Sequence, residues 1–113
     1  MRRIILIFGV VAVSVTLLAC GESATQKEAR INANLKIAGE KYVKLKLKDP
    51  ESAQFQNQFI GIGGGPCGEV NSKNSFGGYT GFKRYISAGE ALTVTESDMA
   101  PEEFNISWRQ FCK

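Results

Sequence analysis

Hydrophobic residues recur with a helical period in the segment from Lys27 to Lys48. Five of them follow one another at spacings of four and three positions, which places them along one side of a helix: Ile31, Leu35, Ala38, Tyr42 and Leu45. The sequence therefore predicts an amphipathic helix over 27–48 whose apolar stripe faces a core. Gly39 weakens this helix by up to about 1 kcal/mol. Asp49-Pro50 ends it, because the residue before a proline is pushed out of the helical region.

The pattern after Asp49 is typical of strands, which we expect over 55–62, 68–72, 78–86 and 91–95. Glutamines alternate with Phe55, Asn57 and Phe59, and this period of two predicts both phenylalanines on one face of the first strand. Residues 87–90 form a turn before the last strand.

A final helix begins at Pro101, is acidic at Glu102 and Glu103, and carries the stripe Phe104, Trp108 and Phe111. Helix, antiparallel sheet and helix together make an α+β fold.

The chain has 113 residues, enough for one domain. It contains no histidine, which excludes catalysis by Ser-His-Asp or Cys-His and zinc or haem held by histidine. We expect no cofactor and no metal site.

Charge divides the chain into a basic and an acidic part. Residues 23–48 contain seven Lys or Arg and two Glu, a local charge of +5, whereas residues 49–113 carry −3. The basic helix would suit anionic headgroups, or it would simply be a solvated surface. The chain without its first 19 residues carries +1, so nucleic-acid binding has no electrostatic support.

Residues 1–19 have the plan of an export signal: Arg2-Arg3, an apolar run from Ile4, and a small residue before Cys20. The run of 16 residues spans about 24 Å, less than the roughly 30 Å of a bilayer core. Its end, Leu17-Leu18-Ala19-Cys20, resembles the lipobox of bacterial lipoproteins. That resemblance implies cleavage before Cys20 and acylation of Cys20. Because Gly21, not Asp, follows it, the resemblance also implies an outer-membrane, periplasm-facing location, with surface exposure as an alternative.

These assignments divide the chain into a signal peptide over 1–19, a lipidated tether over 20–26 and one globular domain over 27–113. Acylation of Cys20 leaves Cys67 and Cys112, an even pair in an oxidising compartment. Cys112 falls beside the stripe of the last helix. We therefore expect a Cys67–Cys112 disulfide. A redox pair would usually show the spacing Cys-x-x-Cys, which the sequence lacks.

The segment from Gly63 to Gly68 matches the dinucleotide-binding fingerprint G-x-G-x-x-G, but a strand rather than a helix is expected after it, so we interpret the match as accidental. The wider motifs are more specific: KDPESAQF over 48–55 and CGEVNSKNSFGGYTGFKRYI over 67–86. They resemble a group of small exported bacterial and phage-associated proteins without an established activity. The resemblance covers about 40 residues and implies a grouping only. It points to these positions for testing: Asn71, Lys73, Asn74, Gly77, Gly78, Tyr79, Gly81 and Phe82.

Five of these residues are candidate binding residues, since they offer donors, acceptors and an aromatic ring to a peptide, glycan or lipid headgroup: Asn71, Lys73, Asn74, Gly78 and Tyr79. Alternatively, Asn and Gly set turns while the aromatic residues pack inside. If both helices cover one face of the sheet, Phe82 is buried and Tyr79 lies at an exposed rim.

Three functions remain open from the sequence. The first is a lipid-anchored, non-catalytic binding or structural module of the cell envelope, with the membrane and an envelope protein or glycan as partners. The second is a protective lipoprotein that inhibits a cell-wall hydrolase or blocks a phage receptor. The third is a small enzyme that uses Glu69 with Lys73 or Tyr79.

Overall fold

The computed structural model describes residues 21–113, so the predicted signal peptide and Cys20 lie outside the described residues. The elements follow the chain in this order: helix α1 (Ala24–Lys44), the 3-10 turn η1 (Pro50–Ser52), strands β1 (Gln54–Ile60), β2 (Pro66–Asn71) and β3 (Lys83–Ser87), the 3-10 turn η2 (Glu90–Leu92), strand β4 (Thr93–Thr95) and helix α2 (Pro101–Phe111). The strands form one antiparallel sheet in the order β1-β2-β3-β4. The α+β fold predicted from the sequence is confirmed.

Helix α1 begins three residues earlier than expected, because Ser23 and Gln26 form a capping box. The Ser23 hydroxyl accepts from the Gln26 backbone N–H, and the Gln26 side chain accepts from the Ser23 N–H. The predicted tether over 20–26 is therefore too long. Only residues 21–23 separate Cys20 from α1.

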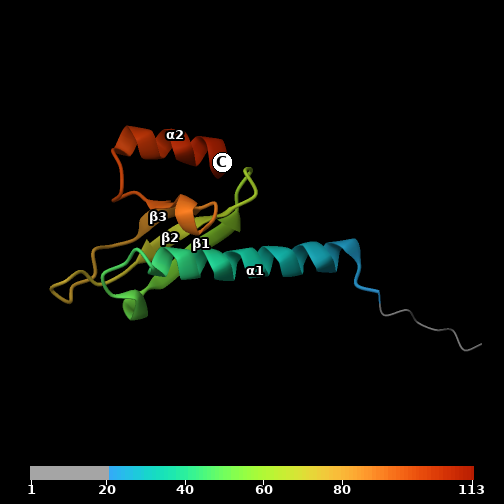
Figure 1. Ribbon diagram of the computed structural model, residues 1–113, viewed down its shortest axis with the longest axis horizontal. Helices are drawn as coiled ribbons and strands as arrows, with labels where there is room; N and C mark the ends of the chain where they lie inside the picture. Colours follow the sequence, from blue (N-terminus) through green and yellow to red (C-terminus); the bar gives the residue numbers. More distant parts are fainter. Residues whose placement is uncertain (1–20) are drawn as a thin grey trace, which may run out of the picture.

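The two helices cover opposite faces of the sheet (Figure 1), so the expectation that both lie on one face is wrong. Alternate residues of β2 and β3 supply the two cores. Val70 and Tyr85 pack with Val43 of α1, whereas Cys67 and Ile86 pack with α2, which contributes Phe104, Trp108 and Cys112. Each core is small, and the sheet is the middle layer of three.

The predicted stripe of α1 is rotated relative to the observed contact. The residues of α1 buried against the sheet are Gly39 and Val43, while Ile31 and Leu45 of the predicted stripe are exposed. Gly39 allows this contact, since a Cβ there would lie 2.6 Å from Pro66 Cγ. The N-terminal part of α1 projects beyond the sheet (Figure 1).

The predicted placement of Phe55 and Phe59 on one face is also wrong. The register between β1 and β2 shifts between Gln56 and Phe59, and Asn57 has a φ of 52°. This bulge inserts one residue and reverses the alternation after it. Phe55 therefore packs on the α1 side, edge-on to Tyr85, and Phe59 packs on the α2 side, edge-on to Trp108.

The Cys67–Cys112 disulfide is present, as predicted, and ties the end of α2 to β2. Phe111, which was expected in the apolar stripe of α2, is exposed, and Cys112 is buried in the core instead. The glycine-rich segment 63–65 is the turn between β1 and β2, and strand β2 follows it directly, as expected for an accidental nucleotide fingerprint.

Candidate functional site

Residues 72–82 form a loop between β2 and β3 that is shaped by its own asparagines. Asn74 Oδ1 accepts hydrogen bonds from the backbone N–H groups of Phe76, at 2.9 Å, and Gly78, at 3.1 Å. Asn71 Oδ1 accepts from the Gly81 N–H at 3.0 Å. The side-chain carbonyl oxygens of both asparagines therefore hold the loop in shape. This is the turn-setting role that the sequence offered as the alternative to ligand binding.

Ser52 of η1 joins the two halves of the sequence motif. Its hydroxyl accepts from the Lys73 N–H at 2.8 Å, and its carbonyl accepts from the Tyr79 hydroxyl at 3.2 Å. Lys73 and Tyr79 form an isolated β-bridge, and the Lys73 ammonium lies 5.6 Å from the centre of the Tyr79 ring. Lys73 and Tyr79 are thus held together at the base of the loop.

The loop exposes aromatic side chains on its outside. Phe76 at the tip is 96% exposed, and Tyr79 is 47% exposed, which confirms the expected exposure of Tyr79. Phe82 is 38% exposed, so the prediction that it is buried is wrong. The reason is that β3 begins only at Lys83, whereas a strand over 78–86 was expected, and Phe82 precedes the part of the chain that the helices cover.

A pocket of about 190 Å³ lies between this loop and the end of α1. Four lysines from three parts of the chain line it: Lys46, Lys48, Lys73 and Lys83. Asn74 and Thr80 of the loop and Asp98 after β4 also line it. We call this cavity the lysine pocket. Of the five candidate binding residues, Lys73 and Asn74 line it.

One of the four lysines is already paired. Lys46 Nζ lies 2.9 Å from Asp98 and donates to the Thr93 carbonyl at 2.8 Å. Burial would raise the pKa of Asp98, but hydrogen bonds from Lys46 and from the Thr95 N–H outweigh it, and the pKa is lowered. Asp98 is therefore ionised at neutral pH, and it offsets one of the four positive charges. The remaining excess of positive charge suits an anionic group.

Lys46, Lys48 and Lys83 are site residues that the sequence patterns did not predict. A signal was present in the alternating lysines from Lys44 to Lys48. The helical period predicts a helix that includes them, but α1 ends at Lys44. The residues after it turn back toward the sheet, and this turn brings Lys46 and Lys48 to the loop.

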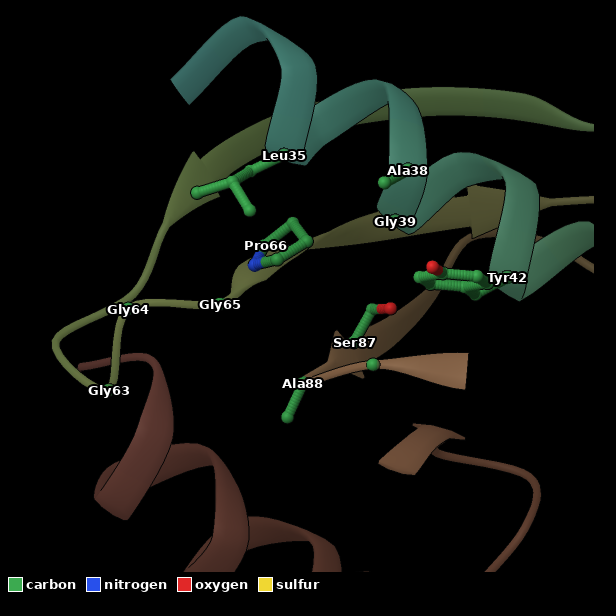
Figure 2. Close-up of a pocket in the computed structure, with 11 residues that line it drawn as sticks. Leu35, Ala38, Gly39, Tyr42, Gly63, Gly64, Gly65, Pro66, Ser87 and Ala88 are labelled. Carbon is green, nitrogen blue, oxygen red and sulfur yellow. The ribbon is translucent and has the colours of Figure 1, made fainter. Parts of the chain in front are cut away.

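A second cavity, of about 320 Å³, is an apolar groove between α1 and the ends of β2 and β3. Figure 2 shows Leu35, Ala38 and Tyr42 of α1 on one side of it and Pro66, Ser87 and Ala88 on the other. The apolar stripe predicted to face the core thus lines this groove in part. Its lining offers no charged side chain that would select a ligand.

Glu69 lies apart from the lysine pocket. It faces the α2 side, where its carboxylate accepts hydrogen bonds from the side chains of Gln56, at 3.2 Å, and Asn57, at 2.9 Å. It lines a third cavity with Trp108 and Lys113, whereas Lys73 lines the lysine pocket. The structure therefore does not bring Glu69 together with Lys73 or Tyr79, as an enzyme using these residues would require.

Within residues 21–113, no group of three or more His, Cys, Asp or Glu side chains is placed to hold a metal ion. No helix in this same stretch is both long enough and apolar enough to span a membrane. Comparison of the chain with protein-family models, with curated proteins and with solved structures finds no match.

Proposed function

We propose that this chain is a lipid-anchored protein of the bacterial outer membrane, facing the periplasm, whose folded part is a non-catalytic binding module for an anionic component of the envelope. The observation that carries the proposal is the lysine pocket beside a loop with exposed aromatic rings. Charge and aromatic surface together suit a ligand that combines a phosphate or carboxylate with an apolar or sugar part.

The pairing of cysteines supports the anchor. The Cys67–Cys112 disulfide uses two of the three cysteines, and the third is Cys20 of the lipobox. Disulfides persist in oxidising compartments such as the periplasm. Intact mass spectrometry of membrane-extracted protein tests the anchor: the main species should lack residues 1–19 and carry acyl chains, and an unmodified chain of 113 residues would contradict it.

The structure of the pocket supports an anionic ligand. Lys48, Lys73 and Lys83 line the pocket besides the paired Lys46, and the aromatic rings of Tyr79 and Phe76 belong to the adjacent loop. The ligand could be a lipid headgroup or a phosphorylated glycan, since both present the same phosphate chemistry. Enzymatic turnover is not needed for either.

Titration with soluble probes tests the pocket. Inorganic phosphate and dihexanoyl phosphatidylglycerol, below its micelle concentration, should bind and shift the amide resonances of loop 72–82, whereas dihexanoyl phosphatidylcholine should bind much more weakly. Lys73→Gln and Lys83→Gln should each weaken binding about tenfold, because each removes a charge-assisted hydrogen bond. Arg109→Gln, which removes one exposed charge from α2, is the matched control. Equal affinity of Lys73→Gln and Arg109→Gln would rule out the lysine pocket.

A second function, inhibition of a cell-wall hydrolase, is favoured by one specific observation. Phe76 is almost fully exposed at the tip of a loop that Asn74 fixes from inside. A large apolar side chain on a loop whose backbone is held in place suits insertion into the cleft of an enzyme, since ordering the loop costs little entropy on binding. Phe76→Ala should then abolish inhibition without changing the melting temperature, whereas Leu92→Ala, at another exposed apolar residue, should not.

A further inference from the structure

The side of α1 that faces away from the sheet carries a row of exposed residues with a composition of its own. Successive members lie three or four positions apart, so they form one line along the helix: Lys27, Arg30, Asn34, Ile37, Lys41 and Leu45. We call this line the outer row. It lies opposite Gly39 and Val43, which pack against the sheet.

The outer row is cationic. It contains Lys27, Arg30 and Lys41, of which Arg30 is paired with Glu22 at 2.9 Å. The two glutamates of α1 lie off the row. Glu28 is about 100° around the helix from Lys27. Glu40 is turned toward the sheet, where its carboxylate accepts a hydrogen bond from Gln58 at 2.7 Å.

The outer row also exposes two large apolar side chains, one between Arg30 and Lys41 and one after Lys41. Ile37 is 65% exposed and Leu45 is 64% exposed. A helix that exposes both cations and apolar side chains can lie in the interface of an anionic bilayer, because the cations are attracted to the headgroups and the apolar side chains are buried among them. The sheet covers the other side of α1 at Gly39 and Val43, in the C-terminal part of the helix, and the outer row is available to a further partner.

The distance from the proposed anchor adds a second, independent argument. Only residues 21–23 separate Cys20 from the first residue of α1. Fully extended, three residues span about 10 Å, which is close to the diameter of a helix with its side chains. This inference rests on the proposed acylation of Cys20, since an acylated Cys20 would hold the start of α1 within about one helix diameter of the bilayer.

We propose that the outer row of α1 lies on the surface of an anionic phospholipid bilayer and fixes the orientation of the whole domain. Lys27 and Lys41 contact lipid phosphates, and Ile37 and Leu45 enter the headgroup region. Helix α2, on the opposite face of the sheet, then points away from the bilayer (Figure 1). The anchor supplies attachment, and the outer row supplies orientation.

The test uses the acylated protein without residues 1–19, reconstituted into vesicles. An introduced cysteine is the one reactive thiol, because Cys20 is acylated and the other two cysteines are bonded. A polarity-sensitive fluorophore is placed at Asn34 on the outer row or at Gln110 on α2, both exposed. Vesicles of phosphatidylcholine alone are compared with vesicles that contain 30 mol% phosphatidylglycerol and a lipid-borne quencher.

The Asn34 probe should shift to the blue and be quenched in vesicles with phosphatidylglycerol, and the Gln110 probe should remain in water. The variant Lys27→Gln/Lys41→Gln should lose this response, with orientation weakened roughly fivefold for each cation removed. Arg109→Gln/Lys113→Gln changes the net charge equally at another place and should keep it. If phosphatidylcholine vesicles retain the protein but the Asn34 probe stays in water even in vesicles with phosphatidylglycerol, the inference is overturned and the anchor remains intact.

If the protein is not retained by phosphatidylcholine vesicles, the proposed anchor fails instead. The outer row is then tested by measuring whether the protein without an anchor binds to phosphatidylglycerol vesicles. Binding to phosphatidylglycerol vesicles that Lys27→Gln/Lys41→Gln abolishes would support the inference, and lack of such binding would overturn it.

Discussion

Gly39 is the residue at which α1 comes closest to the sheet. Its missing side chain leaves room for the Pro66 ring, and a Cβ would lie 2.6 Å from Pro66 Cγ and 2.9 Å from Pro66 Cβ. Helix propensity alone predicts that Gly39→Ala stabilises the protein by about 1 kcal/mol. We expect the opposite, a loss of about 1 to 3 kcal/mol, because the proline ring is stiff and the helix must move.

Urea denaturation of Gly39→Ala with the disulfide intact measures this effect. Asn34→Ala, at an exposed position on the same helix, is the control and should be neutral or slightly stabilising. A more stable Gly39→Ala variant would show that α1 can shift on the sheet without cost.

Two carboxylates, Asp98 and Glu96, make the free energy of unfolding depend on pH in the acid range. Burial would raise the pKa of Glu96, but hydrogen bonds from the backbone and side chain of Arg84 outweigh it and lower the pKa. The pKa of Asp98 is lowered in the same sense by Lys46. A carboxyl group whose pKa is lower in the folded state stabilises the fold at neutral pH, and this contribution is lost as pH falls below about 4.

The free energy of unfolding should therefore decrease more steeply between pH 5 and pH 2 in the wild type than in Glu96→Gln/Asp98→Asn. That variant should also be less stable at pH 7. Denaturation series at fixed ionic strength measure both quantities, and Glu90→Gln controls for the loss of one exposed carboxylate. Parallel pH curves for the wild type and the double variant would contradict the prediction.

Asn57 shows why single residues limit prediction from the sequence. The alternation of glutamine and phenylalanine in 54–59 is regular, yet the chain takes a left-handed conformation at Asn57 and the alternation reverses. Asparagine tolerates this conformation better than most residues, but nothing in the alternation itself marks the bulge. The strand was predictable, and the faces of Phe55 and Phe59 were not.

Elements were more predictable than their contacts. Both helices, the four strands and the Cys67–Cys112 bridge follow from period, turn residues and cysteine number. The orientation of α1 does not, because its more apolar stripe, including Leu35 and Tyr42, lines the groove of Figure 2. The close approach of Gly39 to Pro66 decides which side of α1 packs on the sheet. Helix propensity does not reveal this, because it describes glycine only as a residue that destabilises a helix.

Helix α2 packs through Phe104 and Trp108 and is tied to β2 by the disulfide that follows it. The bond closes a loop with a sequence separation of 45 residues, which in the chain-entropy model is worth on the order of 4 kcal/mol. We expect Cys67→Ser/Cys112→Ser to lose about this much stability and to loosen α2 from the sheet.

Trp108 reports this loosening directly, since it is the only tryptophan of the chain and is buried. Its fluorescence should shift to the red in the double serine variant before the rest of the domain unfolds in urea. Phe104→Ala, with the disulfide intact, should cost a comparable 3 to 5 kcal/mol by opening the same core. An unchanged emission maximum in the serine variant would show that apolar packing alone holds α2.

The whole molecule combines a three-layer fold with a basic surface, the outer row, on the layer formed by α1. The distribution of charge, +5 over 23–48 and −3 over 49–113, was visible in the sequence. The lysine pocket was not, because Lys46, Lys73 and Lys83 are distant in the chain and meet only once α1 ends and the loop 72–82 folds back. A site assembled from three elements leaves no local spacing that a sequence pattern could detect.

The proposed outer-membrane location gives the last prediction, which concerns Gly21. Asp directly after the acylated cysteine typically retains bacterial lipoproteins in the inner membrane, and the lipobox resemblance assigns Gly21 to that sorting position. Gly21 is exposed and precedes the α1 cap at Ser23, so a side chain there should leave the fold intact. Gly21→Asp should move the protein from outer-membrane to inner-membrane fractions in a density gradient, whereas Gly21→Ser should not. If both variants sediment with the wild type, position 21 does not sort this protein, and its location must depend on the folded domain.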